Sequence, residues 1–199
     1  MILLINACVR KESRTKRLAD ALIEKLDREI EEVKLWEADF PEVDEAFLEK
    51  RDALITGKEW SDPMFDLARQ FAAAETIVVA TPYWDLSFPA ALKQYFEQIN
   101  VTGITFRYTP DGVPEPLCKA KRLFYVTTAG GTFVPEEFGF GYVKMLARSF
   151  YGIEDVKIIK AVGLDTDGAD SEGIMEEAIR EMEHLFSTCP AVLNVRKRE

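Results

Sequence analysis

Met1-Ile-Leu-Leu-Ile5 is a continuous apolar run, and the polar residues Asn6-Ala-Cys-Val-Arg-Lys-Glu-Ser-Arg-Thr15 follow it directly. The same succession occurs twice more. Thr76-Ile-Val-Val-Ala80 leads into an aromatic loop, and Leu123-Phe-Tyr-Val126 leads into Thr127-Thr-Ala-Gly-Gly131. Short runs without polar residues are typical of strands that helices cover on both faces. We therefore predict three central strands of a parallel sheet, whose following loops meet in one crevice.

Stretches with helical periodicity separate these runs, as in a sheet whose strands are joined by helices. In the first stretch, Leu18, Leu22 and Leu26 recur on one face. By the same criterion we predict further helices over Asp44–Ile55, after Ser61-Asp-Pro63, and over Phe88–Ile99, Val143–Phe150 and Ile174–Phe186.

Two more strands are predicted where charged residues alternate with apolar ones, over Glu32–Asp39 and Val156–Val162. Charged side chains suit the edges of a sheet, whereas the fully apolar runs suit its centre. The predicted strand order is therefore 2-1-3-4-5 in a five-stranded parallel sheet with helices on both faces. This arrangement is the flavodoxin-like α/β three-layer sandwich, and its ligand crevice lies between the first and third strands.

The composition is that of one globular domain spanning residues 1–199. The net charge of −10 disfavours binding to nucleic acid, and the run Arg196-Lys-Arg198 is too short to change that. No apolar run approaches the roughly 20 residues needed to span a bilayer. The start of the chain lacks a secretory signal. We therefore expect a cytoplasmic protein with no membrane partner.

The side chains that usually carry acid–base or metal chemistry are few. Cys8, Cys118 and Cys189 are too far apart for a zinc site or a disulfide scaffold, so we expect reduced thiols and no bound metal. His184 is the only histidine, and we expect it to be exposed on the last helix. A cofactor would then carry the difficult chemistry, and we predict no catalytic side chain.

The loop after the first strand places hydroxyl groups where the first helix begins. Ser13 and Thr15 are suited to capping this helix. The same hydroxyls, with the free N–H groups of the helix end, are also suited to holding a phosphate. Arg10, Arg14 and Lys16 add positive charge here, although the loop has neither a Walker nor a dinucleotide glycine pattern.

The loop after the third strand is rigid, apolar and aromatic, and reads Pro82-Tyr-Trp-Asp-Leu-Ser-Phe-Pro89. Its rings suit stacking on a planar ligand and the exclusion of water, and its backbone can form hydrogen bonds with the ligand edge. The rings could equally cover the core beside the next helix.

The diglycine Gly130-Gly131 follows the fourth strand. It could be no more than a turn. Alternatively, the missing side chains let backbone donors approach a ligand edge on which negative charge develops. A hydroxyl-bearing helix start, an aromatic wall and a backbone donor together fit a flavin mononucleotide (FMN).

The segment Thr105-Phe-Arg-Tyr-Thr-Pro-Asp-Gly112 alternates in polarity and ends in a turn sequence. It predicts a surface hairpin, or a wall or lid over a pocket.

The combined pattern resembles the FMN-dependent NADH:quinone oxidoreductases and azoreductases of the flavodoxin-like fold. Besides the aromatic loop and Thr127–Gly131, the residues that carry the resemblance are Ala91-Leu-Lys-Gln-Tyr-Phe96, Gly103-Ile-Thr-Phe-Arg-Tyr-Thr109 and Phe150-Tyr-Gly-Ile-Glu-Asp-Val156. The resemblance covers nearly the whole chain and is weakest over residues 37–60.

The resemblance implies a role for each matching position. Ser13 and Thr15 would bind the FMN phosphate, and Tyr108 and Phe150 would shape the substrate pocket. Residues that would line the flavin ring or its far edge are Pro82, Tyr83, Trp84, Asp85, Leu86, Thr128, Gly130 and Gly131. The resemblance also implies a homodimer with its two flavin sites near the subunit interface.

Three positions depart from the pattern of the family. Ala7 stands where relatives carry a hydroxyl, Asp85 replaces an asparagine, and Ala129 replaces a polar or basic residue. These changes bear on the affinity for FMN, on its reduction potential and on substrate preference.

The function expected from the resemblance is hydride transfer from NADH or NADPH to quinones or related aromatic acceptors, with ping-pong kinetics. Two alternatives remain open at this stage. One is an electron carrier of the flavodoxin type that NAD(P)H does not reduce directly. The other is a flavodoxin-like binding module that has lost its cofactor, as Ala7 and Asp85 would allow.

Overall fold

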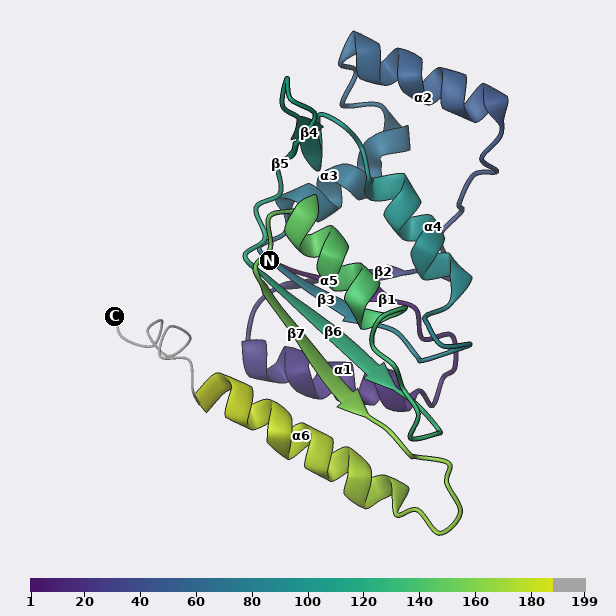
Figure 1. Ribbon diagram of the computed structural model, residues 1–199, viewed down its shortest axis with the longest axis vertical. Coiled ribbons are helices and arrows are strands. Elements are labelled where there is room, and N and C mark those ends of the chain that lie inside the picture. Colours follow the sequence, from purple (N-terminus) through teal and green to yellow (C-terminus); the bar gives the residue numbers. More distant parts are fainter. Residues whose placement is uncertain (188–199) are drawn as a thin grey trace.

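A computed structural model describes residues 1–187 of the chain, so Cys189 and the basic run 196–198 lie outside the described residues (Figure 1). The elements in chain order are β1 (Ile2–Asn6), α1 (Arg14–Leu26), β2 (Ile30–Lys34), α2 (Glu45–Gly57), the 3-10 turn η1 (Pro63–Phe65), α3 (Asp66–Ala73), β3 (Thr76–Ala80), α4 (Ala90–Ile99), β4 (Phe106–Tyr108), β5 (Pro114–Pro116), β6 (Arg122–Thr128), α5 (Phe140–Ser149), β7 (Asp155–Ala161) and α6 (Ser171–Ser187).

The main sheet has five parallel strands in the order β2-β1-β3-β6-β7. The hairpin strands β4 and β5 pair only with each other, so β6 and β7 are the fourth and fifth strands of the main sheet. The predicted order 2-1-3-4-5 is therefore confirmed, and the two strands with interspersed charges lie at the edges.

Helices cover both faces of the sheet, and alternate residues of each central strand point into two separate cores. Leu3 and Ile5 of β1 pack in the core beneath α3, α4 and α5. Ile2 and Leu4 pack in the core beneath α1 and α6. The two helix layers lie on opposite sides of the strands in Figure 1. Because both faces are buried, the central strands need the continuous apolar runs that their sequences show.

The predicted second strand is partly wrong, because the strand ends at Lys34 and not at Asp39. The backbone turns at this point, with the Glu37 N–H donating to the Lys34 carbonyl at 3.0 Å. Leu35 is nevertheless buried, so its apolar character reflects packing of the turn rather than a longer strand.

The remaining elements lie close to their predicted positions. The helix expected over Asp44–Ile55 is α2, and the Asp44 side chain caps it by accepting from the Phe47 N–H at 2.8 Å. The predicted hairpin is β4–β5, whose strands are joined by a bidentate ion pair between Arg107 and Glu115 at 2.7 and 3.0 Å. Within residues 1–187, no helix has both the length and the apolar character needed to cross a membrane.

Candidate functional site

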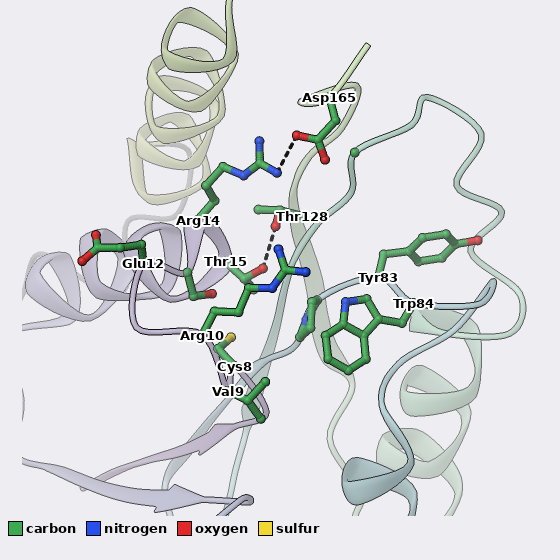
Figure 2. Close-up of a pocket in the computed structure, with 13 residues that line it drawn as sticks. Cys8, Val9, Arg10, Glu12, Arg14, Thr15, Tyr83, Trp84, Thr128 and Asp165 are labelled. Atoms are coloured by element: carbon green, nitrogen blue, oxygen red, sulfur yellow. Dashed lines mark hydrogen bonds and ion pairs between the residues drawn. The ribbon is translucent and has the colours of Figure 1, made fainter.

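A cavity of about 220 Å³ lies at the carboxyl ends of β1, β3 and β6, where the three special loops meet (Figure 2). The residues that line it are Cys8, Val9, Arg10, Glu12, Ser13, Arg14, Thr15, Pro82, Tyr83, Trp84, Thr128, Gly130 and Asp165. The predicted convergence of the loops is therefore confirmed. The predicted residues among the lining are Ser13, Thr15, Pro82, Tyr83, Trp84, Thr128 and Gly130.

The N-terminus of α1 forms one wall of this cavity. Ser13 is the N-cap, and its Oγ accepts from the Lys16 N–H at 3.2 Å. The N–H groups of Arg14 and Thr15 belong to the first turn of α1, where no carbonyl of the helix lies within reach. They therefore remain available as donors. The first turn of α1 contains no acidic residue. Free donors and the positive end of the helix dipole suit this wall to an anion such as a phosphate.

Two hydroxyl groups connect α1 with the end of β6. Thr15 Oγ1 and Thr128 Oγ1 lie 2.6 Å apart, and either can be the donor. Both residues are buried. Since each hydroxyl carries one hydrogen and only one is used in this contact, the pair keeps one donor for a further acceptor at the cavity.

Arg14 connects the same helix end with the loop between β7 and α6, and Figure 2 shows its guanidinium group directed at Asp165. Its Nη2 donates to Asp165 Oδ1 at 2.8 Å, and its Nη1 donates to the Leu164 carbonyl at 3.3 Å. Sequence reasoning missed Asp165. The available signal was its place in the loop after the fifth strand, which ends at the same edge of the sheet.

A side chain at position 130 would have to displace the carboxylate of Asp165. A Cβ atom on Gly130 would lie 2.3 Å from Asp165 Oδ2, whereas a Cβ on Gly131 would meet no atom within 4 Å. The Asp165 N–H donates to the Gly130 carbonyl at 2.9 Å. Gly130 thus lines the cavity beside a carboxylate, and Gly131 lies outside the lining.

Asn6 fixes the start of the first loop and was also missed. Its Oδ1 accepts from the Cys8 N–H at 2.8 Å, and its Nδ2 donates to Glu32 Oε1 at 2.7 Å. An asparagine directly after an apolar run is a recognisable signal for such a turn. Cys8 follows it, and burial raises the pKa of the Cys8 thiol to about 11, so the thiol is protonated at neutral pH.

The aromatic loop turns sharply between Trp84 and Ser87. Two backbone hydrogen bonds join these residues, at 3.1 and 2.8 Å. Asp85 and Leu86 between them have φ angles of 50° and 66°, which few residues other than glycine adopt. They form the tip of the turn and are not among the residues that line this cavity. Their predicted place beside the flavin ring stays a prediction.

Tyr83 is attached to β6, because its N–H donates to the Thr128 carbonyl at 3.0 Å. Its ring is directed away from Thr15 and Arg14 in Figure 2. Tyr83 therefore presents its backbone, and not the face of its ring, to the cavity. The Trp84 side chain is 39% exposed and is the aromatic group available at the mouth.

The structure does not bring Tyr108 and Phe150 to the cavity. Phe150 packs on Phe106 with a ring-centroid distance of 4.6 Å, and Tyr108 meets the same ring at 5.4 Å. This aromatic group lies at the β4–β5 hairpin, at the opposite end of the sheet from the carboxyl ends of the strands (Figure 1). Within one chain, both residues are remote from Ser13 and Trp84.

The structure also shows where the cysteine and histidine side chains of the described residues lie. Cys8 and Cys118 are free thiols, as expected. His184 is exposed on α6. Among the residues that the structure describes, no three acidic, histidine or cysteine side chains gather in a way that could hold a metal ion.

The family model for Flavodoxin_2, described as having the flavodoxin-like fold, matches residues 1–186. The chain is 36% identical over 184 residues to an FMN-dependent NADH:quinone oxidoreductase of Coprothermobacter proteolyticus, covering 88% of this chain and 91% of that protein. It is 35% identical over 185 residues to a protein of the same name from Lachnoclostridium phytofermentans, covering 88% and 92%.

Solved structures of the same fold superimpose over most of the chain. An azoreductase from Bacillus anthracis gives a TM-score of 0.79 at 21% identity, covering 92% of this chain and 97% of that one. An FMN-dependent NADH-azoreductase from Bacillus anthracis, solved in complex with FMN, gives 0.78 at 24% identity, covering 94% and 97%. At these identities the likeness establishes the fold.

Proposed function

This chain belongs to the Flavodoxin_2 family, and it is similar over most of its length to FMN-dependent NADH:quinone oxidoreductases. We propose that it has the same enzymatic activity. It binds FMN, takes hydride from NADH, and reduces quinones or related aromatic acceptors. The observation that carries the proposal is the cavity where an anion-binding helix end, an aromatic loop and the Thr128–Gly130 segment meet.

FMN, when bound, would supply the redox chemistry by accepting a hydride from NADH and delivering it to the acceptor. The donor set of the cavity fits its phosphate. The N–H groups at the start of α1, the Ser13 hydroxyl and the spare hydrogen of the Thr15–Thr128 pair are all donors, and Arg10 and Arg14 supply positive charge. A cavity of about 220 Å³ is smaller than most ligand pockets. We therefore assign it to the phosphate end of the cofactor.

Residues of the aromatic loop would hold the ring of the cofactor. There Pro82 and Trp84 exclude water from one side, and the backbone of Tyr83 is held in place by its hydrogen bond to Thr128. The backbone at Gly130 and Gly131 offers polar groups to the far edge. Asp85 and Leu86 would affect the binding of the ring through the shape of the turn that they form. The carboxylate of Asp85 would also make the surroundings of the ring more negative.

We further propose that the active form is a cytoplasmic homodimer of single-domain subunits. The support is the position of Tyr108 and Phe150, the residues assigned to the substrate pocket. Both lie at the far end of the sheet from the cavity of their own chain. They can contribute to a substrate pocket only if a second subunit brings them there. Tyr108, at 53% exposed, is open to such a contact.

An absorption spectrum of the purified protein, before and after anaerobic addition of NADH, tests the function. We expect a flavin spectrum that NADH bleaches and benzoquinone restores. Steady-state rates should give parallel double-reciprocal plots, as a ping-pong mechanism requires. Protein that stays colourless after incubation with FMN contradicts the proposal. Flavin that is bound but not bleached by NADH would instead indicate an electron carrier.

A further inference from the structure

The first turn of α1 has an unusual charge distribution for a helix N-terminus. It carries the cations Arg14, Lys16 and Arg17 and no acidic residue. Cations are unfavourable at this end of a helix because the dipole is positive there. The carboxylate that pairs with Arg14 comes from another segment, since Asp165 of the β7–α6 loop lies 2.8 Å from its guanidinium group.

Contacts with three segments of the chain fix the position of the Asp165 carboxylate. Gly130 leaves the space that Asp165 Oδ2 fills, because a Cβ there would lie only 2.3 Å away. The Asp165 N–H is bound to the Gly130 carbonyl at 2.9 Å. The Leu164 carbonyl beside it accepts from both Arg14 and Ser171, at 3.3 and 2.6 Å. Arg14, Gly130 and Asp165 all line the same cavity.

Asp165 changes the charge that an incoming anion meets. The charged residues of the lining are Arg10, Glu12, Arg14 and Asp165, so its positive and negative side chains are equal in number. Arg14, the cation at the first position of α1, is already paired. A phosphate held at this helix end would share Arg14 with the carboxylate of Asp165.

We propose that Asp165 is a specificity-determining residue that weakens the binding of phosphate-bearing flavins by competing with the phosphate for Arg14. This inference rests on the proposed function, since it concerns the same FMN site. Its consequence is a smaller preference for FMN over riboflavin, which lacks the phosphate, than the cations of the loop would otherwise give.

A purely structural role for Asp165 predicts the opposite sign. If Asp165 serves only to hold Arg14 in position, its removal disorders Arg14 and weakens FMN binding. If it competes with the phosphate, its removal frees Arg14 and tightens FMN binding. The substitution Asp165→Asn separates the two roles, because it removes the charge and keeps the size that fits beside Gly130.

The experiment measures dissociation constants for FMN and for riboflavin by quenching of flavin fluorescence, with the full-length protein freed of flavin. For Asp165→Asn we expect a dissociation constant for FMN about three- to fivefold lower at low salt, the size expected for one partly exposed charge. The value for riboflavin should stay unchanged. The effect on FMN should shrink at about 1 M salt, where the screening length is about 3 Å. Arg14→Gln should raise the dissociation constant for FMN about fivefold or more, since a charged hydrogen bond to the phosphate is lost. It should leave the dissociation constant for riboflavin unchanged.

A matched control is available on the same helix. Arg17 pairs with Glu172 at 2.7 Å, also between α1 and the α6 region, and neither residue lines the cavity. Glu172→Gln should leave both dissociation constants unchanged. Equal tightening by Glu172→Gln would show a general effect of net charge and would overturn the inference.

The remaining outcomes are also decisive. Weaker or unchanged FMN binding in Asp165→Asn overturns the inference and leaves the proposed function intact. Wild-type protein that binds neither flavin contradicts the proposed function itself. Far-ultraviolet circular dichroism of each variant confirms that the comparison is made between folded proteins.

Discussion

At the scale of single residues, Gly130 and Gly131 are neighbours in sequence but differ in what surrounds them. A methyl group on Gly130 must displace the Asp165 side chain, whereas one on Gly131 points into open space. We expect Gly130→Ala to lower the free energy of unfolding by about 1 kcal/mol, because the Arg14–Asp165 pair is lost and the loop must shift. Gly131→Ala should stay within about 0.5 kcal/mol of wild type. Urea unfolding of the two variants measures both values, and equal losses would contradict the assigned packing.

The Cys8 thiol predicts a dependence of stability on pH. Burial raises its pKa from 9.0 to about 11, so the folded state retains a proton that the unfolded state loses above pH 9. The stabilisation is complete below pH 9 and is lost as the pH rises towards 11. Wild type should therefore lose up to about 1.4 kcal/mol per pH unit more than Cys8→Ala in this range. Urea unfolding at pH 8, 9, 10 and 11 measures the difference, which should be constant below pH 9. Parallel curves up to pH 11 would exclude a buried thiol at this position.

At the scale of secondary-structure elements, the start of α1 combines a helix cap with a proposed phosphate site, and Ser13 belongs to both. Ser13→Ala removes the cap and should cost about 1 kcal/mol of stability. Ser13→Asp keeps a capping oxygen but adds negative charge facing the phosphate. We expect Ser13→Asp to be close to wild type in thermal stability and to bind FMN at least about tenfold more weakly, a difference of about 1.4 kcal/mol. FMN binding by Ser13→Asp as tight as wild type would remove Ser13 from the phosphate site.

The elements themselves were largely predictable from the sequence, because their signals are local. The apolar runs gave β1, β3 and β6, and the charged edge strands gave the strand order. The error in the second strand arose because Leu35 is buried in a turn, and burial alone does not distinguish a turn from a strand. The cavity followed from topology, since loops after neighbouring parallel strands must meet.

The contacts that complete the cavity were not predictable in the same way. Arg14 and Asp165 are separated by 151 positions, and no periodicity or motif links them. The direction of the Tyr83 ring and the backbone hydrogen bond from Tyr83 to Thr128 also do not follow from the sequence of the aromatic loop alone. Asp85 and Leu86 have left-handed backbone angles, although neither is the glycine that usually indicates such angles in a sequence.

At the scale of the whole molecule, the cavity and the Tyr108–Phe150 group lie at opposite ends of the sheet. If the enzyme is a homodimer with shared sites, two different inactive chains should complement each other. We expect Ser13→Asp and Tyr108→Ala, each of low activity alone, to give mixed dimers in which one of the two sites is intact. Co-expression with two affinity tags and sequential purification isolates the mixed species for assay with NADH and benzoquinone.

The control for this experiment pairs two Ser13→Asp chains that carry the two different tags, which should not restore activity. Light scattering coupled to size-exclusion chromatography gives the mass of each species. A mixed dimer no more active than its parents would contradict a site shared between subunits, and a monomeric mass for an active enzyme would exclude sharing altogether.

The ion pair between Arg14 and Asp165 also has a consequence for the order of events during synthesis. The proposed phosphate end of the cavity is made from residues near the start of the chain and from a loop that is translated late, after β7. A nascent chain that ends before this loop has its hydroxyls and its aromatic turn but lacks Asp165, the carboxylate that pairs with Arg14. The carboxylate that competes for Arg14 is thereby added only when translation is almost finished, so a truncated product from an interrupted message would differ from the finished protein in how it captures flavin.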